Sequence, residues 1–204
     1  MDKACTIYLV RHGQSLANIT GVMGGDEPLS DLGKEQALNL GKKLKNVDFS
    51  VVFSSDKLRA RQTAELIIKG RDLEIQTHKD LKERSFGSLD KEKNKEYMHL
   101  FDALSDMEDD EVWKWKIVDD METAEEAVGR FYRAVEEIAR TYLGKKVLIV
   151  AHSTVNRSFL VKIGFGTFAN LQSGAFLNTG YAVIDFDGEN FKVKETFGVI
   201  IKNK

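Results

Sequence analysis

Short apolar runs alternate with helix-like segments along most of the chain. Four apolar runs have the length and composition of buried strands: Thr6–Val10, Ser50–Phe53, Glu74–Thr77 and Val147–Ala151. Four segments between or after them have helical character: 30–45, 58–67, 123–142 and 155–163. Because alternating strands and helices fold into a parallel sheet covered by helices, the pattern predicts an α/β protein. We expect a three-layer sandwich, in which a mostly parallel, doubly wound sheet has helices on both faces.

Capping residues indicate where two of these helices begin. Thr123 is followed three residues later by Glu126, the spacing of a capping box, so a helix begins there. Ser153 or Thr154 can cap the next helix, because a side-chain hydroxyl accepts a hydrogen bond from a backbone N–H of the first turn.

Two segments depart from the alternation. Residues 181–194 combine alternating apolar and polar positions with turn residues, which predicts an antiparallel hairpin. Residues at about 88–122 have helical spacing instead, and we interpret them as a cap inserted in one strand-to-helix connection. The stretch Asp102–Glu126 holds eleven Asp or Glu and two Lys, which we interpret as a solvated face. We expect residues 1–204 to form a single domain with this cap insertion.

Composition and charge narrow the function classes. The formal net charge of −2 gives no general attraction to nucleic acid or to an anionic membrane. No apolar run approaches the roughly 18–20 residues that cross a bilayer, and the first residues lack the apolar core of a signal peptide. The one cysteine, Cys5, excludes an intrachain disulfide. We therefore expect a cytoplasmic protein without nucleic-acid or membrane partners.

Basic residues follow three of the predicted strands. The first strand ends at Arg11 and His12, the second is followed by Ser54–Ser55 and by Arg59, and the strongest apolar run ends at His152. In open α/β sheets, ligands bind beyond the carboxyl ends of the strands. Two arginines and two histidines gathered there repel one another unless an anion neutralises them. A phosphoryl group suits such a cluster, bound by the arginines and by backbone N–H groups of the helix after His152.

The residues around these positions, taken together, are similar to those of one known family. The segments that carry the similarity are Arg11–Ser15 with Asn18, Asp26–Ser30 with Gly33, Gln36 and Ala37, Ser54–Ala64, Leu81–Gly87, Val150–His152 and Asn178–Thr179. In this order they resemble the histidine phosphatase superfamily, the phosphoglycerate-mutase-like fold. The chain departs from the family pattern at Ser153 and Lys91, where glycine is usual. A serine still offers its backbone N–H, so we expect the site to survive.

The resemblance implies a role for each site residue. His12 attacks phosphorus and carries a phosphohistidine, which water then hydrolyses. Arg11, Arg59 and His152 bind the phosphoryl oxygens, and Glu83 protonates the leaving oxygen. The resemblance also implies three substrate-binding residues: Asn18, Gly24 and Ser153. No spacing of His or Cys resembles a metal site, so we expect metal-independent chemistry with no cofactor.

Three functions stay open at this point. The first is a phosphomonoesterase that hydrolyses a small phosphorylated metabolite. The second is a phosphoglycerate mutase, which Arg84 directly after Glu83 favours, although no arginine lies between Arg84 and Arg130. We expect the acidic cap to weaken binding of the second anionic group that a mutase must hold. The third is a non-catalytic phosphate-binding protein of the same fold. The specific substrate and a homodimer also stay open.

Overall fold

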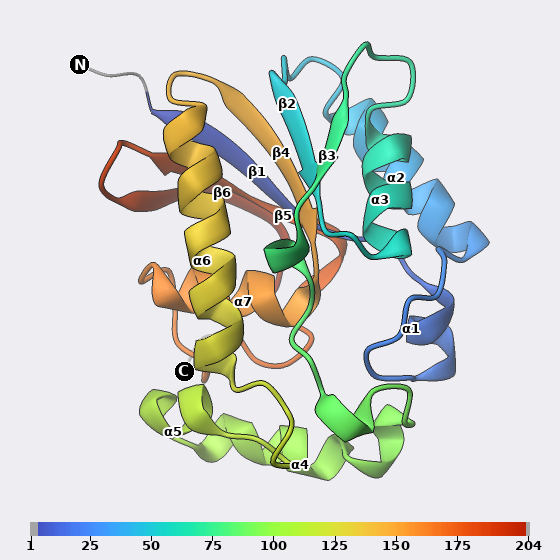
Figure 1. Ribbon diagram of the computed structural model, residues 1–204, viewed down its shortest axis with the longest axis vertical. Coiled ribbons are helices and arrows are strands. Elements are labelled where there is room, and N and C mark those ends of the chain that lie inside the picture. Colours follow the sequence, from blue (N-terminus) through green and yellow to red (C-terminus); the bar gives the residue numbers. More distant parts are fainter. Residues whose placement is uncertain (1–3, 203–204) are drawn as a thin grey trace.

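Six strands form one sheet in the computed structural model (Figure 1). The structure describes residues 4–202, apart from the side chains of Asn94, Met98, Asp102, Ser105 and Asp106. The strands are β1 (Cys5–Arg11), β2 (Val51–Ser54), β3 (Ile75–Thr77), β4 (Lys146–Ala151), β5 (Phe176–Phe186) and β6 (Phe191–Val199), in the order β3-β2-β4-β1-β5-β6. The strands β3, β2, β4 and β1 pair in parallel, whereas β5 and β6 are antiparallel. The predicted α/β fold with a mostly parallel sheet is confirmed.

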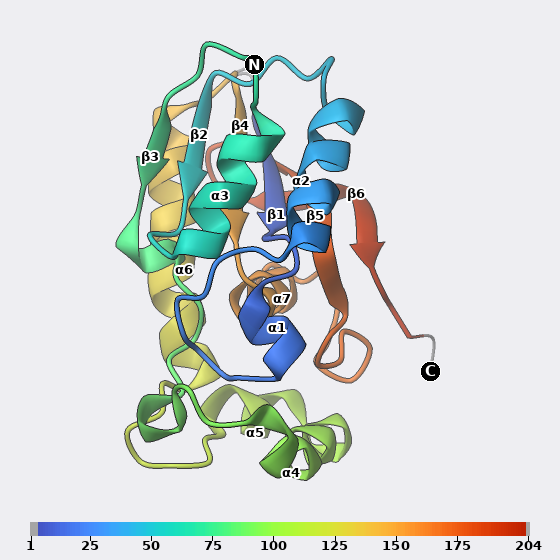
Figure 2. The same ribbon diagram turned by 90° about the vertical axis from the view of Figure 1, so that its right-hand side faces the viewer.

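Helices cover both faces of the sheet, as predicted (Figure 2). The helices are α1 (Leu16–Thr20), α2 (Asp31–Lys43), α3 (Leu58–Ile67), α4 (Met98–Asp102), α5 (Asp109–Lys114), α6 (Ala124–Thr141) and α7 (Ser153–Lys162). Short 3-10 turns occur at Lys79–Leu81, Gly87–Leu89, Asn94–Glu96 and Ala103–Asp106. None of the helices in the described part of the chain is long and apolar enough to cross a bilayer.

Alternating residues of the central strands build two cores. Ile7 and Leu9 of β1 pack with α6 and α7, whereas Val10 packs with α2 and α3. In β4, Ile149 belongs to the first core and Val150 to the second. Successive side chains of a strand point to opposite faces, so a strand covered on both sides is apolar throughout. This burial on both faces explains why the apolar runs identified the central strands.

The boundaries of two elements differ from the sequence prediction. The helix α7 begins at Ser153, whereas we expected it to begin at Val155. His152 is its N-cap residue, and the His152 side chain makes no capping hydrogen bond. The strand β5 begins at Phe176 and includes the predicted polar turn Asn178–Thr179. Within the strand, Thr179 has a φ of 55° and the pairing register shifts, so the turn forms a bulge. This bulge breaks the alternation from which the strand's start was read. The predicted capping box of Thr123 at α6 is confirmed.

The short helices between β3 and α6 gather at one end of the molecule (Figures 1 and 2). Trp113 packs edge-on against Phe168, with ring centroids 4.6 Å apart, and Trp115 packs against Phe101 at 5.5 Å. Seven of the nine acidic residues between 102 and 126 whose side chains are described are exposed, which confirms the solvated face. This cap therefore turns its aromatic residues inward and its acids toward water.

Candidate active site

A pocket lies beyond the carboxyl ends of the parallel strands. It has a volume of about 270 Å³, and Arg11, His12, Arg59 and Glu83 all line it. His152 is fully buried beside it, and the ring centroids of His12 and His152 are 5.1 Å apart. The structure thus brings together the five residues expected to be catalytic, although they come from four distant segments of the chain.

The hydrogen bonds of His12 fix its tautomer. Arg59 Nε donates to His12 Nε2 at 3.1 Å, and an arginine nitrogen acts only as a donor. The proton of the neutral ring therefore lies on Nδ1, which donates to the carbonyl oxygen of Gly13 at 2.7 Å. The one lone pair of Nε2 therefore faces the side of the pocket where the arginines gather, and it becomes free to attack when Arg59 turns this donor to a bound phosphoryl oxygen. A neutral imidazole with such a lone pair is a nitrogen nucleophile.

Both histidines are held neutral by their surroundings. Burial lowers the pKa of His12 well below its usual 6.5, and the positive charges of Arg59 and Arg11 lower it further. Burial also lowers the pKa of His152 well below 6.5, again helped by Arg59. His152 Nε2 lies 2.9 Å from Ser55 Oγ, whereas its buried Nδ1 has no partner among the described residues. An oxygen of a bound anion could accept a hydrogen bond at this position.

These pKa shifts predict a stability that depends on pH. The unfolded chain binds more protons than the folded chain between pH 6.5 and the lowered pKa values. The stabilisation is therefore present above pH 6.5 and is lost as the pH falls below it. We expect the free energy of unfolding to fall by up to about 1.4 kcal/mol per pH unit for each histidine. Urea denaturation at a series of pH values measures this slope.

Single variants assign the slope to the histidines. His12→Asn and His152→Asn should each flatten the decline just below pH 6.5. His99→Asn is the control, because His99 is exposed on α4. Equal slopes in all three variants would mean that other groups cause the pH dependence.

The two arginines expected to bind a phosphoryl group point their donors differently. Arg11 Nη1 donates to the carbonyl of Phe176 at 2.5 Å, and its buried Nε has no partner in the part of the chain described. Arg59 is 4% exposed and donates through Nη1 to the carbonyl of Gly25 at 3.0 Å. Backbone carbonyls thus orient both guanidinium groups without neutralising them. An anion in the pocket would supply the missing negative charge.

Glu83 is held by the start of α7. Its Oε2 accepts the N–H of Thr154 at 3.0 Å, and its Oε1 accepts those of Val155 at 3.1 Å and Arg84 at 2.9 Å. A helix N-terminus attracts a carboxylate because its first N–H groups lack partners in the helix. We expected these N–H groups to bind a phosphoryl group, and for Thr154 and Val155 this expectation was wrong. They position the acid instead.

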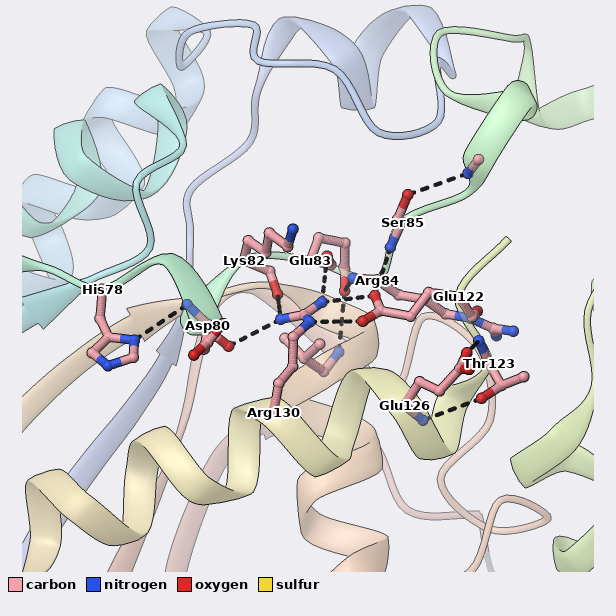
Figure 3. Close-up of polar contacts among 12 residues, drawn as sticks. His78, Asp80, Lys82, Glu83, Arg84, Ser85, Glu122, Thr123, Glu126 and Arg130 are labelled. Carbon is pink, nitrogen blue, oxygen red and sulfur yellow. Dashed lines mark hydrogen bonds and ion pairs between the residues drawn. The ribbon is translucent and has the colours of Figure 1, made fainter. Parts of the chain in front are cut away.

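An ion pair between Arg130 and Glu122 fixes the loop that carries Glu83 (Figure 3). Arg130 of α6 pairs with Glu122 through two hydrogen bonds, Nε to Oε1 at 2.7 Å and Nη2 to Oε2 at 2.8 Å. The same guanidinium donates to the carbonyls of Asp80, Lys82 and Glu83, each at 2.9 Å. Arg130 therefore ties both sides of the cap connection to the long helix.

Removing the contacts of Arg130 with Glu122 and with the three carbonyls, here called the Arg130 clamp, should destabilise the fold. The side chains of Arg130 and Glu122 are only 11% and 18% exposed, so Arg130→Met leaves a partly buried carboxylate unpaired. We expect the free energy of unfolding to fall by about 3 kcal/mol. Arg133→Met is the matched control, since Arg133 is exposed on the same helix, and it should change stability by less than about 0.5 kcal/mol. Equal losses in the two variants would contradict the clamp.

The three residues expected to bind substrate also line the pocket. Asn18 Oδ1 accepts hydrogen bonds from the N–H of Ser15 at 3.1 Å and from Asn178 Nδ2 at 3.3 Å. Gly24 has a φ of +62°, a backbone conformation that favours glycine, and a Cβ there would force the carboxylate of Asp90 to move. Ser153 lines the pocket at the first residue of α7.

Two further arginines line the pocket, and sequence reasoning gave neither a place there. Arg84 is buried and donates to the carbonyls of Glu122 and Trp115, so it supports the cap connection. Arg157 is buried within α7, where the neighbouring residues 155–161 are also buried. A charged residue inside an apolar helical run was the available signal for Arg157. By contrast, the cap lysines Lys114 and Lys116 do not line this pocket.

Comparison with known proteins identifies the family. Residues 7–197 match the model of the histidine phosphatase superfamily (branch 1). This chain belongs to that superfamily. It is 31% identical over 191 residues to the "uncharacterized phosphatase PhoE" of Bacillus subtilis, covering 93% of this chain and 92% of the relative. It is 32% identical over 190 residues to a "metal-independent phosphoserine phosphatase" of Arabidopsis thaliana, covering 87% of this chain and 75% of the relative.

Solved structures agree with the fold of this superfamily. A phosphoglycerate mutase from Bacillus anthracis superposes with a TM-score of 0.78 at 25% identity, covering 97% of this chain and 94% of that chain. Relatives of this chain therefore include both phosphatases and mutases. His12 follows directly after the last residue of β1, inside the segment that matches the family model.

Proposed function

We propose that this protein is a phosphomonoesterase that hydrolyses a small phosphorylated metabolite through a phosphohistidine on His12. The observation that carries the proposal is the neutral His12 ring, with its Nε2 lone pair directed at Arg59. When phosphate binds, Arg11 and Arg59 hold its oxygens, and His12 Nε2 attacks phosphorus in line with the leaving oxygen. His152 supplies a further hydrogen bond to the phosphoryl oxygens.

Glu83 is the only carboxylic acid among the described residues that line the pocket. In the proposed first step it gives its proton to the leaving alcohol oxygen as the P–O bond breaks. In the second step its carboxylate takes a proton from the water that attacks the phosphohistidine. The water oxygen bonds to phosphorus as the bond between His12 Nε2 and phosphorus breaks, which releases inorganic phosphate and returns His12 to its neutral form.

We propose that the reaction needs no metal. The charged residues that line the pocket in the described part of the chain are four arginines and one glutamate, a set that repels a divalent cation. Purified protein should release phosphate from 4-nitrophenyl phosphate at the same rate with and without EDTA. Loss of activity on chelation, with recovery on adding Mg²⁺ or Zn²⁺, would contradict this part of the proposal.

A phosphoglycerate mutase is the second candidate, since similar proteins include mutases. A mutase must keep its phosphorylated product bound until the phosphoryl group returns to another oxygen. We favour hydrolysis because the relative that matches over 93% of this chain and 92% of its own length is a phosphatase by name. The deciding assay compares phosphate release from 3-phosphoglycerate with its conversion to 2-phosphoglycerate. Faster interconversion would make the protein a mutase, and phosphate binding without either reaction would make it non-catalytic.

Several broader expectations stay proposals of the same kind. They are a single domain over residues 1–204, a cytoplasmic location, and a small phosphorylated metabolite as partner, without nucleic acid or membrane. A homodimer stays open. The net charge of −2 supports the absence of nucleic-acid and membrane partners, and the single buried cysteine supports a cytoplasmic location.

A further inference from the structure

Arg157 is a buried cation without a partner. It is 8% exposed, and its side chain makes no hydrogen bond or ion pair with the described residues. Its guanidinium lies over the ring of Phe168, 4.8 Å from the ring centroid, so an aromatic face covers one side of the group. Burial lowers the pKa of Arg157 to about 10, helped by the charge of Arg84, and the group stays protonated at neutral pH. A buried charge is costly unless an opposite charge pairs with it.

The charges lining the pocket exceed what one phosphoryl group neutralises. Among the described residues that line the pocket, four arginines against one glutamate leave a surplus of three positive charges, and a phosphoryl dianion offsets two of them. Arg11 and Arg59 flank His12, and Arg84 donates to two backbone carbonyls. Arg157 is therefore the cation that a bound phosphoryl group leaves without a counter-charge.

The described side chains of the cap form no ion pair with Arg157. Of the cap residues that line the pocket, those described are apolar: Phe101, Leu104 and Val112. Asp109 of the cap accepts the N–H of Phe168 at 2.9 Å. Its charge, like that of Glu83, raises the pKa of Arg157, but it forms no ion pair with Arg157 among the described residues. We expected the acidic cap to repel a second anionic group. Seven of the nine described acids between 102 and 126 are exposed, and the kinetic comparison of anionic with neutral esters tests that expectation.

The space around Arg157 continues past the phosphoryl site. A second cavity of about 330 Å³ shares Phe101, Leu104, Arg157 and Phe168 with the first and reaches Lys202. Arg157 stands where the two cavities meet. A substrate bound by its phosphoryl group beside His12 can thus extend past Phe101, Leu104 and Phe168 toward the guanidinium of Arg157.

We propose that this site selects phosphate esters that carry a second anionic group, and that Arg157 binds that group. The inference rests on the proposed phosphatase function and deepens it. A carboxylate and a second phosphate share the chemistry that a guanidinium fork recognises. The apolar walls make the charged contact stronger than it would be in water, because little solvent screens it. Arg157 acts on specificity and does not touch the reacting phosphorus.

Matched pairs of esters test the proposal. The first pair is 3-phosphoglycerate and glycerol 3-phosphate, which differ by a carboxylate against a hydroxymethyl group. The second is 4-carboxyphenyl and 4-(hydroxymethyl)phenyl phosphate, which place the same difference farther from phosphorus. A third arm, fructose 1,6-bisphosphate against fructose 1-phosphate, tests a second phosphate. We expect kcat/KM to be about 10- to 100-fold higher for the anionic member of at least one pair. Equal or lower values in all three pairs would overturn the proposal.

Variants assign the preference to Arg157. Arg157→Met should lower kcat/KM for the anionic ester to the value for its neutral counterpart. The value of kcat/KM for the neutral ester should stay within about threefold of wild type. Arg157→Lys should recover part of the preference. Arg61→Met replaces an exposed arginine of α3. It should change neither the preference for the anionic ester nor the turnover of the neutral ester. A preference that persists in Arg157→Met would overturn the role of this residue. If Arg157→Met does not fold, the comparison between Arg157→Lys and the wild type decides the role.

The same experiment separates the two proposals. The neutral esters and 4-nitrophenyl phosphate report the phosphatase activity alone, without a second anion. Turnover of these esters with no preference for the anionic members overturns the inference and leaves the proposed function standing. No turnover of any ester overturns the proposed function. In that case calorimetric binding of 3-phosphonopropionate against propylphosphonate still measures the preference for a second anion, and equal affinities would overturn it.

Discussion

Replacing His12 with alanine should abolish phosphate release while leaving the fold intact. The ring is the nucleophile in the proposed mechanism, and no other described histidine or cysteine lines the pocket. Removing a nucleophile in comparable hydrolases lowers kcat by roughly 10⁶-fold. We expect a loss of at least about 10³-fold for 4-nitrophenyl phosphate, because that ester needs little further assistance. Initial-rate kinetics on the purified variant measure it.

The fold should tolerate the change, since His12 lies at the end of β1 and outside both hydrophobic cores. Circular dichroism and thermal unfolding at pH 7.5 check that the variant folds. His99→Ala, in an exposed position on α4, should keep full activity. Activity above a few per cent of wild type in a folded His12→Ala protein would mean that another group attacks phosphorus.

Replacing Glu83 with glutamine should slow hydrolysis by an amount that depends on the leaving group. A general acid contributes about 10²–10⁴-fold when the leaving oxygen needs a proton. We therefore expect a loss of that size for an alkyl ester such as glycerol 3-phosphate. For 2,4-dinitrophenyl phosphate the leaving phenolate is stable without a proton, and the loss should be less than about tenfold. A plot of log kcat/KM, which reports phosphorylation of His12 and not the later hydrolysis of the phosphohistidine, against leaving-group pKa should be steeper for the variant than for wild type.

The position of Glu83 makes this comparison necessary. Its carboxylate also holds the first turn of α7 through Thr154 and Val155, and a glutamine keeps only one acceptor oxygen. A merely structural defect would slow all esters equally. Glu65→Gln, at an exposed site on α3, is the matched control and should change no rate. A uniform loss across the leaving-group series would remove Glu83 from the role of proton donor.

The sequence predicted the central strands and most helices because their patterns are local. Buried strands such as β4 are apolar on both faces, and the capping box of Thr123 is read from two residues. The start of α7 was misplaced for the opposite reason. The group that caps it, Glu83, comes from a segment 71 residues earlier in the chain, and no local pattern contains it. The bulge at Thr179 likewise hid the beginning of β5, because its positive φ interrupts the alternation.

The candidate site was predictable where residues follow directly from strand ends. Arg11, His12 and His152 are placed by topology alone, since parallel strands deliver their carboxyl ends to one edge. The partners of those residues were not predictable. Whether α7 donates to phosphate or to Glu83 depends on how the loop before the cap folds. The direction of Arg157 depends on packing against Phe168, which belongs to a loop that has no strong pattern of its own.

Trapping the phosphorylated enzyme tests the central claim most directly. Wild-type protein mixed with a fast substrate and quenched within milliseconds in alkali should carry one phosphoryl group per chain, stable in base and labile in acid. Mass spectrometry of the peptide that contains Arg11 and His12 should place it on His12. Hydrolysis should also proceed with retention of configuration at a chiral phosphorus, because two displacements each invert it. Inversion at phosphorus, or a phosphoryl group on any other residue, would contradict the account.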